Sequence, residues 1–337
     1  MVQEGDVAVQ KHARDILFFD LSVSRRAPQA PFPTLRELVV LWKKAQEDPD
    51  FAPKEFEKGA VTALIKDCEI DEPNEIATLL IEVSDKNAPN TTYLDHAKRT
   101  ARHIKKEEPE GSGFSAHVVM SLRSRSDQVN TYLTLVEAIP VVSVSRIQAT
   151  LNKIIRELCE GPKNSPFTYV RPGGTKKLVG YVPHILLAGY PSDRFLQDIE
   201  EGTINGLKLV APTAHESLGA GQYLKMNELA VSVSVSRDIP KGERWETILT
   251  GAAAKKSEFP TARIYVQPEA GGKSFHVDVD VETGNIIGQA YVKSRRLSGF
   301  DQLLETSAVE QIVPHFMQRM KAVLIKERGD GTDAKAA

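Results

Sequence analysis

The sequence lacks the features that mark several specialised classes of protein. It has only two cysteines, Cys68 and Cys159, and no Cys-x-x-Cys pair, which argues against a disulfide framework or a zinc ribbon and favours a reducing compartment. No apolar run approaches the roughly 18 residues of a membrane span, and the N-terminus has no apolar segment of the kind found in secretory signals. We therefore expect a cytoplasmic protein that does not insert into a membrane and whose cysteines are not bonded to each other.

Motifs for nucleotide binding and for hydrolysis are also absent. The phosphate-loop motif GxxxxGK[ST], the dinucleotide fingerprint GxGxxG, the hydrolase motif GxSxG and the zinc-protease motif HExxH do not occur. A glycine-rich loop at residues 171–177 lacks the spacing that wraps backbone N–H groups around a phosphate, so we interpret it as a hairpin turn. We expect no cofactor and favour a protein without enzymatic activity.

The overall composition is that of an ordinary globular protein. Of the 337 residues, 41% are hydrophobic and 26% are charged, which excludes disordered, collagen-like and coiled-coil classes. The 43 lysines and arginines against 45 aspartates and glutamates give a net charge of -2. This balance excludes a wholly basic nucleic-acid binder, but it leaves room for local basic clusters.

The chain has one strong break near its middle. Two prolines and a glycine at residues 161–166 cannot extend the helix before them, so we place a domain boundary there. The prediction is an N-terminal domain at 1–160, a C-terminal domain at 161–330 and a disordered tail at 331–337. Strands outnumber helices without regular alternation, which predicts an α+β fold with mostly antiparallel sheets and packed helices in both domains.

Hydrophobic periodicity predicts the individual elements. Thr34 and Glu37 have the spacing of a capping box and start a helix. Residues 93–106 are interpreted as a short helix, and Pro314 lies early in a closing helix at 308–328. Further helices are expected at 145–159, 192–201 and 243–254. Strands are expected at 16–23, 59–68, 76–83, 117–123, 132–136, 181–187, 206–210, 229–235, 263–267, 274–281 and 286–292.

One predicted strand carries a row of acidic side chains. Because alternate residues of a strand share a face, His276, Asp278, Asp280 and Glu282 would project together while the valines between them face the core. Such a row is typical of the wet face of an antiparallel sheet, so we expect these carboxylates to be exposed and to bind no ion. The alternative is a Mg²⁺- or Mn²⁺-dependent nuclease that uses Asp278, Asp280 and Glu282 as its metal ligands.

A second acidic group resembles the active site of restriction-type nucleases only weakly. Those enzymes place an acid on one strand and a Glu-x-Lys motif on the next. Here the corresponding residues are Asp67 and the segment from Glu82 to Lys86, in which the acid and the lysine are four residues apart. Alternation would put Asp85 on the opposite face of the strand, so we favour solvation of the strand end.

Basic residues form more coherent groups. In the predicted helix at 93–106, basic side chains would cover one broad face and could neutralise phosphates. The alternative is a solvated helix face, because three glutamates follow at 107–110. The first group contains Lys98, Arg99, Arg102, Lys105 and Lys106. Other groups are Arg123 and Arg125 on one strand face, Lys176 and Lys177 in a turn, and Lys293, Arg295 and Arg296 at the end of the last hairpin.

The order of elements in the second half is similar to that of a known family. A helix at 192–201 and a strand at 206–210 precede a strand at 229–235 that runs into Asp238-Ile239-Pro240. A helix containing Thr247-Ile248-Leu249, three strands within 263–292 and Leu297-Ser298-Gly299 follow. A long helix with Met317, Arg319, Met320 and Lys321 ends the series. Over residues 190–328 this order and spacing resembles the RexA phage-exclusion proteins of lambdoid prophages.

The resemblance implies a two-domain α+β protein that acts in abortive infection, binds double-stranded DNA with little sequence preference, and self-associates as a homodimer. A second defence-system protein is a further implied partner. Our preferred interpretation is a non-enzymatic DNA-binding protein that uses the basic groups named above. The alternatives are the metal-dependent nuclease and a protein-interaction module without a nucleic-acid partner.

Overall fold

The structure of the protein is a computed structural model. It describes residues 10–25, 27, 29–126, 128–160, 165–171, 178–217, 225–236, 238–269, 274–300, 302 and 304–329. Residues 161–164 of the expected domain boundary, most of the glycine-rich loop with Lys176 and Lys177, and the expected tail at 331–337 lie outside the described residues.

The chain has the α+β class expected from its sequence, and its contacts divide it into two compact units. The first unit contains residues 1–17, 21–187 and 295–337, and the second contains residues 18–20 and 188–294. The division therefore lies at residues 187/188 and 294/295, whereas the sequence pointed to a single boundary near residue 161. The final helix returns to the first unit, which a boundary drawn along the sequence does not anticipate.

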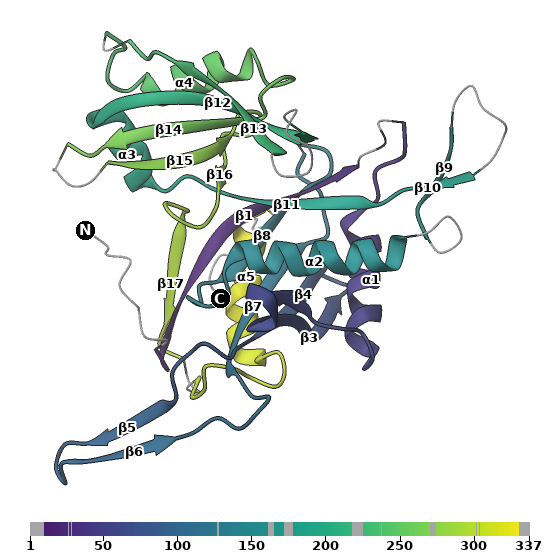
Figure 1. The fold of residues 1–337 in the computed structure, drawn as a ribbon, viewed down its shortest axis with the longest axis vertical. Coiled ribbons are helices and arrows are strands. Elements are labelled where there is room, and N and C mark those ends of the chain that lie inside the picture. The colour runs from purple at the N-terminus through teal and green to yellow at the C-terminus, as the bar shows by residue number, and fades with distance from the viewer. Residues whose placement is uncertain are drawn as a thin grey trace, which may run out of the picture. The chain divides into compact units, whose positions relative to one another are not determined.

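The first unit is built on an antiparallel sheet whose strands occur in the order β11-β1-β8-β7-β4-β3-β2, with β17 beside β1 (Figure 1). Between β4 and β7 the ladder runs without interruption from Ile76 opposite Ser121 to Asp85 opposite Ser112. The strands are β1 (Ala13–Arg25), β2 (Lys54–Phe56), β3 (Val61–Asp71), β4 (Ile76–Asp85), β7 (Ser112–Ser121), β8 (Thr131–Glu137), β11 (Pro183–Gly189) and β17 (Ser294–Ser298). A 3-10 turn at Glu57–Gly59 follows β2, and β9 (Thr168–Val170) pairs with β10 (Leu178–Gly180).

Three helices cover this sheet. Helices α1 (Leu35–Glu47) and α2 (Val144–Cys159) contact each other and β3, whereas α5 (Pro314–Glu327) contacts β7 and β8. Every residue of β8 is buried, as expected for a strand that is covered on both faces. Cys68 and Cys159 are both free and buried, which confirms that they do not pair with each other.

The helix starts follow the local sequence signals. Thr34 caps α1 and forms the predicted capping box with Glu37, and the Ser143 side chain accepts a hydrogen bond at the start of α2. The predicted start of the last helix at residue 308 is wrong, because the helix begins at Pro314. Proline fits the first helical turn, where its missing N–H would have no helical partner.

A buried polar network lies inside the first unit. The Arg14 Nε group donates to Glu137 Oε1 at 2.8 Å, and His117 Nδ1 lies 2.7 Å from Glu137 Oε2. The backbone N–H of Val313, which precedes α5, donates to His117 Nε2 at 3.2 Å. Since Nε2 accepts, the proton sits on Nδ1 and is donated to Glu137. The network joins β1, β7 and β8 to the start of α5.

The second unit is a smaller α+β body. Its antiparallel sheet has the order β13-β12-β14-β15-β16, which confirms the three antiparallel strands expected between residues 263 and 292. Phe195 of α3 packs edge-to-face on Trp245 of α4, with ring centroids 5.3 Å apart. The elements are α3 (Asp193–Glu201), β12 (Thr203–Ser217), β13 (Lys225–Val233), α4 (Arg244–Ala253), β14 (Thr261–Gln267), β15 (Phe275–Asp280) and β16 (Ile286–Ile287).

Candidate nucleic-acid interface

The segment that carries the densest basic group is a β-hairpin, and the predicted helix at 93–106 is wrong. Strands β5 (Thr91–Asp95) and β6 (Thr100–Ile104) pair antiparallel with each other in a separate two-stranded sheet. The hairpin lies between β4 and β7 in the sequence and extends away from the sheet of the first unit (Figure 1). We call residues 91–105 the arm.

Every residue of the arm is exposed. Four basic side chains against one acidic side chain give the arm a net charge of +3, in a chain whose net charge is -2. The basic residues are Lys98, Arg99, Arg102 and Lys105, and the acidic residue is Asp95. The structure therefore gathers four of the predicted binding residues on one projecting ribbon, although by a different element from the one expected.

The tip of the arm presents two of these cations. The Asp95 side chain accepts a hydrogen bond from the Lys98 backbone N–H at 3.1 Å and stabilises the turn. Arg99 has a φ of 53°, in the left-handed region that favours glycine or asparagine. The turn places both charged side chains at the far end of the ribbon.

The base of the arm is held by Lys106, the fifth predicted binding residue of this group. Its ammonium group donates to the carbonyl oxygens of Lys86, at 3.1 Å, and of Ala88, and its backbone N–H donates to Asn90 Oδ1 at 3.1 Å. Lys106 is half-buried, so its role is to hold the two ends of the arm together. Gly111, which directly precedes β7, lies against the backbone of Asp85. A Cβ atom added to Gly111 would come within 2.9 Å of the backbone atoms of Asp85.

The two faces of the arm differ in character. Paired residues of an antiparallel ladder point to the same side, so Tyr93, Arg102 and Ile104 share one face, whereas Leu94 and His103 lie on the other. The Arg102 guanidinium carbon lies 4.9 Å from the centroid of the Tyr93 ring. Sequence reasoning missed Tyr93 and Ile104. The available signal was the β-branched and aromatic run at 91–93, which favours a strand over a helix.

Arg123 and Arg125 lie far from the arm. Strand β7 ends at Ser121, so both residues follow the strand and do not share a strand face as predicted. Arg123 pairs with Glu75, and the Arg125 backbone N–H donates to Thr131. The arm joins the opposite end of β7, about 30 Å away for a ten-residue strand. These two arginines therefore do not extend the surface of the arm.

The predicted group of Lys293, Arg295 and Arg296 is divided between the two units. Lys293 belongs to the second unit, where its ammonium group lies 4.7 Å from the centroid of the Phe18 ring. Arg295 and Arg296 are exposed residues of β17 in the first unit, and Arg296 lies 3.6 Å from Asp15. The prediction that these three residues end a hairpin is wrong, because β17 pairs with β1.

The carboxylates of β15 are individually engaged. Asp278 accepts two hydrogen bonds from Arg263, at 2.8 and 3.0 Å, and this pairing raises the pKa of the arginine. Asp280 accepts three hydrogen bonds from the following turn, and Glu282 lies 3.0 Å from Lys256. The expectation that all three are exposed is correct for Glu282 only, since Asp278 and Asp280 are half-buried.

The second acidic group does not assemble either. Asp67 accepts backbone hydrogen bonds from Cys68 and from Ile312, and Asp85 caps the turn at Asn87. Glu82 lies 3.7 Å from Lys66 on the neighbouring strand β3. The backbone carbonyl of Lys86 accepts a hydrogen bond from the Lys106 ammonium group. Within the described ranges, no three histidine, cysteine or acidic side chains are placed to hold a metal ion.

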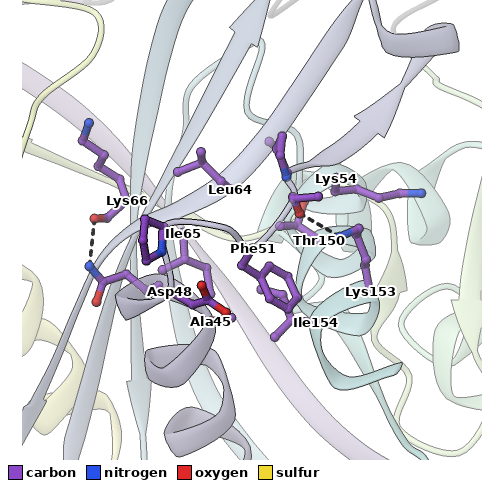
Figure 2. Close-up of a pocket in the computed structure, with 15 residues that line it drawn as sticks. Ala45, Asp48, Phe51, Lys54, Leu64, Ile65, Lys66, Thr150, Lys153 and Ile154 are labelled. Atoms are coloured by element: carbon purple, nitrogen blue, oxygen red, sulfur yellow. Dashed lines mark hydrogen bonds between the residues drawn. The ribbon is translucent and has the colours of Figure 1, made fainter. Parts of the chain in front are cut away.

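A pocket of about 200 Å³ lies in the first unit, between the end of α1, strand β3 and helix α2 (Figure 2). The Lys153 ammonium group donates to the Ala52 carbonyl at 2.7 Å (Figure 2) and also lies 2.7 Å from Glu157. A hydrogen bond to Glu310 and the charge of Glu82 raise the pKa of Lys66. Groups of the protein itself thus engage both lysines, and we assign no ligand to the pocket.

Comparison with protein families, with curated proteins and with solved structures gave no match for this chain. Among the residues that the structure describes, no helix has both the length and the apolar character required to cross a membrane.

Proposed function

We propose that the protein binds double-stranded DNA through its arm, without an enzymatic step and with little sequence preference. The observation that carries the proposal is an entirely exposed two-stranded ribbon with a net charge of +3 in a chain of net charge -2. A two-stranded ribbon is one of the elements that enter a groove of DNA. Its exposed cations can neutralise phosphates whatever the base sequence.

The charge distribution along the arm limits where DNA can lie. Lys98 and Arg99 are at the tip, whereas the exposed glutamates 107, 108 and 110 follow the arm towards the sheet. Phosphates are attracted to the cations of the arm and repelled by these glutamates, because charges of like sign oppose each other at short range. The contact is therefore expected on the ribbon itself and not on the segment at 107–110 that follows it.

Two rival functions receive less support. The nuclease hypothesis requires carboxylates that converge on a metal ion, but Asp278 is engaged by Arg263 and Asp280 by its own turn. A protein-interaction module would not need four exposed cations on one ribbon. The role in abortive infection, the homodimer and the second defence protein remain predictions from the resemblance to the RexA family.

The proposal is tested by removing charge from the arm while its turn is preserved. In the variant Lys98→Ala/Arg99→Asn/Lys105→Ala, asparagine at position 99 retains a residue that tolerates a positive φ. Binding to a mixed-sequence duplex is measured by fluorescence anisotropy across a salt series. We expect affinity at about 100 mM salt to fall by well over tenfold, and the log–log salt slope to shrink by roughly 0.9 for each phosphate that the variant no longer neutralises.

The matched control removes the same charge from the second unit. In Lys241→Ala/Lys255→Ala/Lys256→Ala, three exposed lysines outside the arm are replaced, so a general effect of net charge would weaken this variant equally. The arm hypothesis predicts near-normal binding for the control. Equal binding by the arm variant and the wild-type protein would exclude the proposal, and Mg²⁺-dependent cleavage of the duplex would restore the nuclease alternative.

A further inference from the structure

We infer that the arm lies in the major groove of B-form DNA, with the face that carries Tyr93, Arg102 and Ile104 against the base edges. This inference rests on the proposed function and adds the groove, the nucleic-acid form and the residues that contact bases. It follows from three properties of the arm: its width, the asymmetry of its two faces, and the apolar surface that it exposes.

The width of the ribbon selects the groove. Two paired strands lie about 4.8 Å apart, and with their outer backbone atoms the ribbon is roughly 10 Å wide. The major groove of B-DNA is about 12 Å wide and accepts such a ribbon, whereas the minor groove is about 6 Å wide. Each arm strand has five residues, about 17 Å at 3.4 Å per residue. That length spans roughly five base pairs of the groove.

The asymmetry of the faces selects the side that meets the bases. Guanine presents two acceptors in the major groove, and thymine presents a methyl group. The Tyr93 face offers partners for both, because Arg102 can donate two hydrogen bonds to guanine and Ile104 can contact the methyl group. Stacking on the Tyr93 ring at 4.9 Å restricts the orientations of the guanidinium group before DNA arrives.

The exposed apolar surface of this face is explained by the same contact. Tyr93 is 53% exposed and Ile104 is 46% exposed, on a ribbon whose residues are all exposed. These two side chains form a small apolar patch beside Arg102, and contact with the base edges would remove it from water. One arginine and two apolar side chains read only a few base pairs, which is compatible with low sequence preference.

Duplex RNA should not be an equivalent ligand. The major groove of A-form RNA is deep and narrow, and side chains cannot read it. A ribbon that only neutralised phosphates would bind both duplexes, whereas a ribbon seated in the groove discriminates between them. The form of the duplex therefore separates groove insertion from simple charge attraction.

The first experiment compares grooves. Binding of the full-length protein to duplex DNA is measured alone, with netropsin in the minor groove, with methyl green in the major groove, and against duplex RNA of the same sequence. We expect methyl green to displace the protein, netropsin to leave binding nearly unchanged, and RNA to bind at least tenfold more weakly. Displacement by netropsin, or equal binding to RNA, would overturn the inference.

The second experiment tests the contact of Arg102 with guanine. Duplexes in which 7-deazaguanine replaces guanine lack one of the two acceptors, so wild-type affinity should fall by about three- to tenfold. Arg102→Lys keeps the positive charge but lacks the planar guanidinium fork that holds two parallel hydrogen bonds in a fixed geometry. This variant should bind ordinary DNA with the wild-type salt slope and show a smaller further loss on the modified duplex than the wild-type protein. If the variant and the wild-type protein lose equally, Arg102 does not read guanine.

Leu94 supplies the control for the apolar contact. It is 63% exposed and lies on the opposite face of the arm. We expect Ile104→Ala to weaken binding severalfold and Leu94→Ala to leave it unchanged; the reverse order would assign the other face to the groove.

If the lysine and arginine variants of the arm retain full binding, the proposed function fails. If only the groove experiments fail, DNA binding stands and its geometry is different.

Discussion

The first unit contains two antiparallel ribbons that follow one another along the chain and differ in what surrounds them. In β4 and β7, which pair over ten residues each, most side chains are buried. In β5 and β6, which continue the chain between them, every side chain is exposed. The same backbone pairing thus occurs once as part of a core and once as an arm in solvent.

This difference in burial predicts that β4 and β7 contribute to the stability of the fold, whereas the arm contributes to binding. Burial of apolar side chains provides most of the free energy of folding, so substitutions in β4 and β7 are expected to act on stability. The arm contributes little apolar burial and is held at its base by Lys106 and Asn90. Its side chains are therefore available for a partner, and substitutions there are expected to act on binding.

The largest effect is predicted for the buried network of the core. Glu137→Ala would leave the Arg14 guanidinium group without its buried partner and would remove the hydrogen bond to His117. Loss of one member of a buried charged pair typically lowers the free energy of unfolding by about 3–5 kcal/mol. Urea denaturation followed by circular dichroism measures this loss. A loss below about 1 kcal/mol would show that the network does not support the core.

Removal of the arm should weaken DNA binding and leave the stability of the fold almost unchanged. Asn90 Oδ1 and the Lys106 N–H are 3.1 Å apart, so a loop of about four glycine and serine residues can replace residues 91–105. We expect DNA affinity to fall by well over tenfold while the urea midpoint changes little. Loss of the folded state in this variant would show that the arm also stabilises the sheet, and would end the distinction between the two ribbons.

A smaller and pH-dependent effect is predicted where α5 meets the sheet. Burial by itself raises the pKa of Asp71, but the Lys321 ammonium group at 2.9 Å and the Asn74 amide lower it below its ordinary value. Asp71 therefore stabilises the fold above its unfolded pKa of about 3.9, and this contribution disappears as the pH falls through the lower folded value. Asp71→Asn should reduce the unfolding free energy by about 1 kcal/mol at pH 7.

The pH series provides the control for that prediction. Because protonated aspartate also lacks charge, the wild-type protein and Asp71→Asn should converge in stability once the pH is well below the folded pKa. Urea midpoints at pH 7, about 4, about 3 and about 2 follow the convergence. A constant difference across this range would show that the substitution acts through packing and not through the ion pair.

The smallest effect is predicted for single substitutions on the arm. Lys105→Ala and Leu94→Ala change exposed side chains with little packing, so each should alter the unfolding free energy by less than about 0.5 kcal/mol. Thermal unfolding followed by circular dichroism checks both variants. A loss of more than about 1 kcal/mol in either would mean that the arm is part of the cooperative core.

Sequence reasoning located the densest basic cluster but predicted the wrong secondary structure for it. Lys98, Arg99, Arg102 and Lys105 do share one element, but it is a ribbon. The physical reason lies in the flanking strands. Asp85 and Ser112 are paired neighbours, so the chain between them must leave and return at one point. A helix of 14 residues would instead carry the chain about 21 Å in one direction.

The sequence by itself determined the features that depend on neighbours along the chain. The capping box of Thr34 and Glu37, the apolar stripe of α2, the turn between β3 and β4, and the α+β class all arise from short-range spacing. Only the tertiary structure decided which distant residues meet. In the folded chain the predicted basic groups lie in separate places, Asp278 pairs with Arg263, and α5 packs on the first unit. Each of these arrangements depends on how strands and helices pack against each other, and no local sequence pattern encodes that packing.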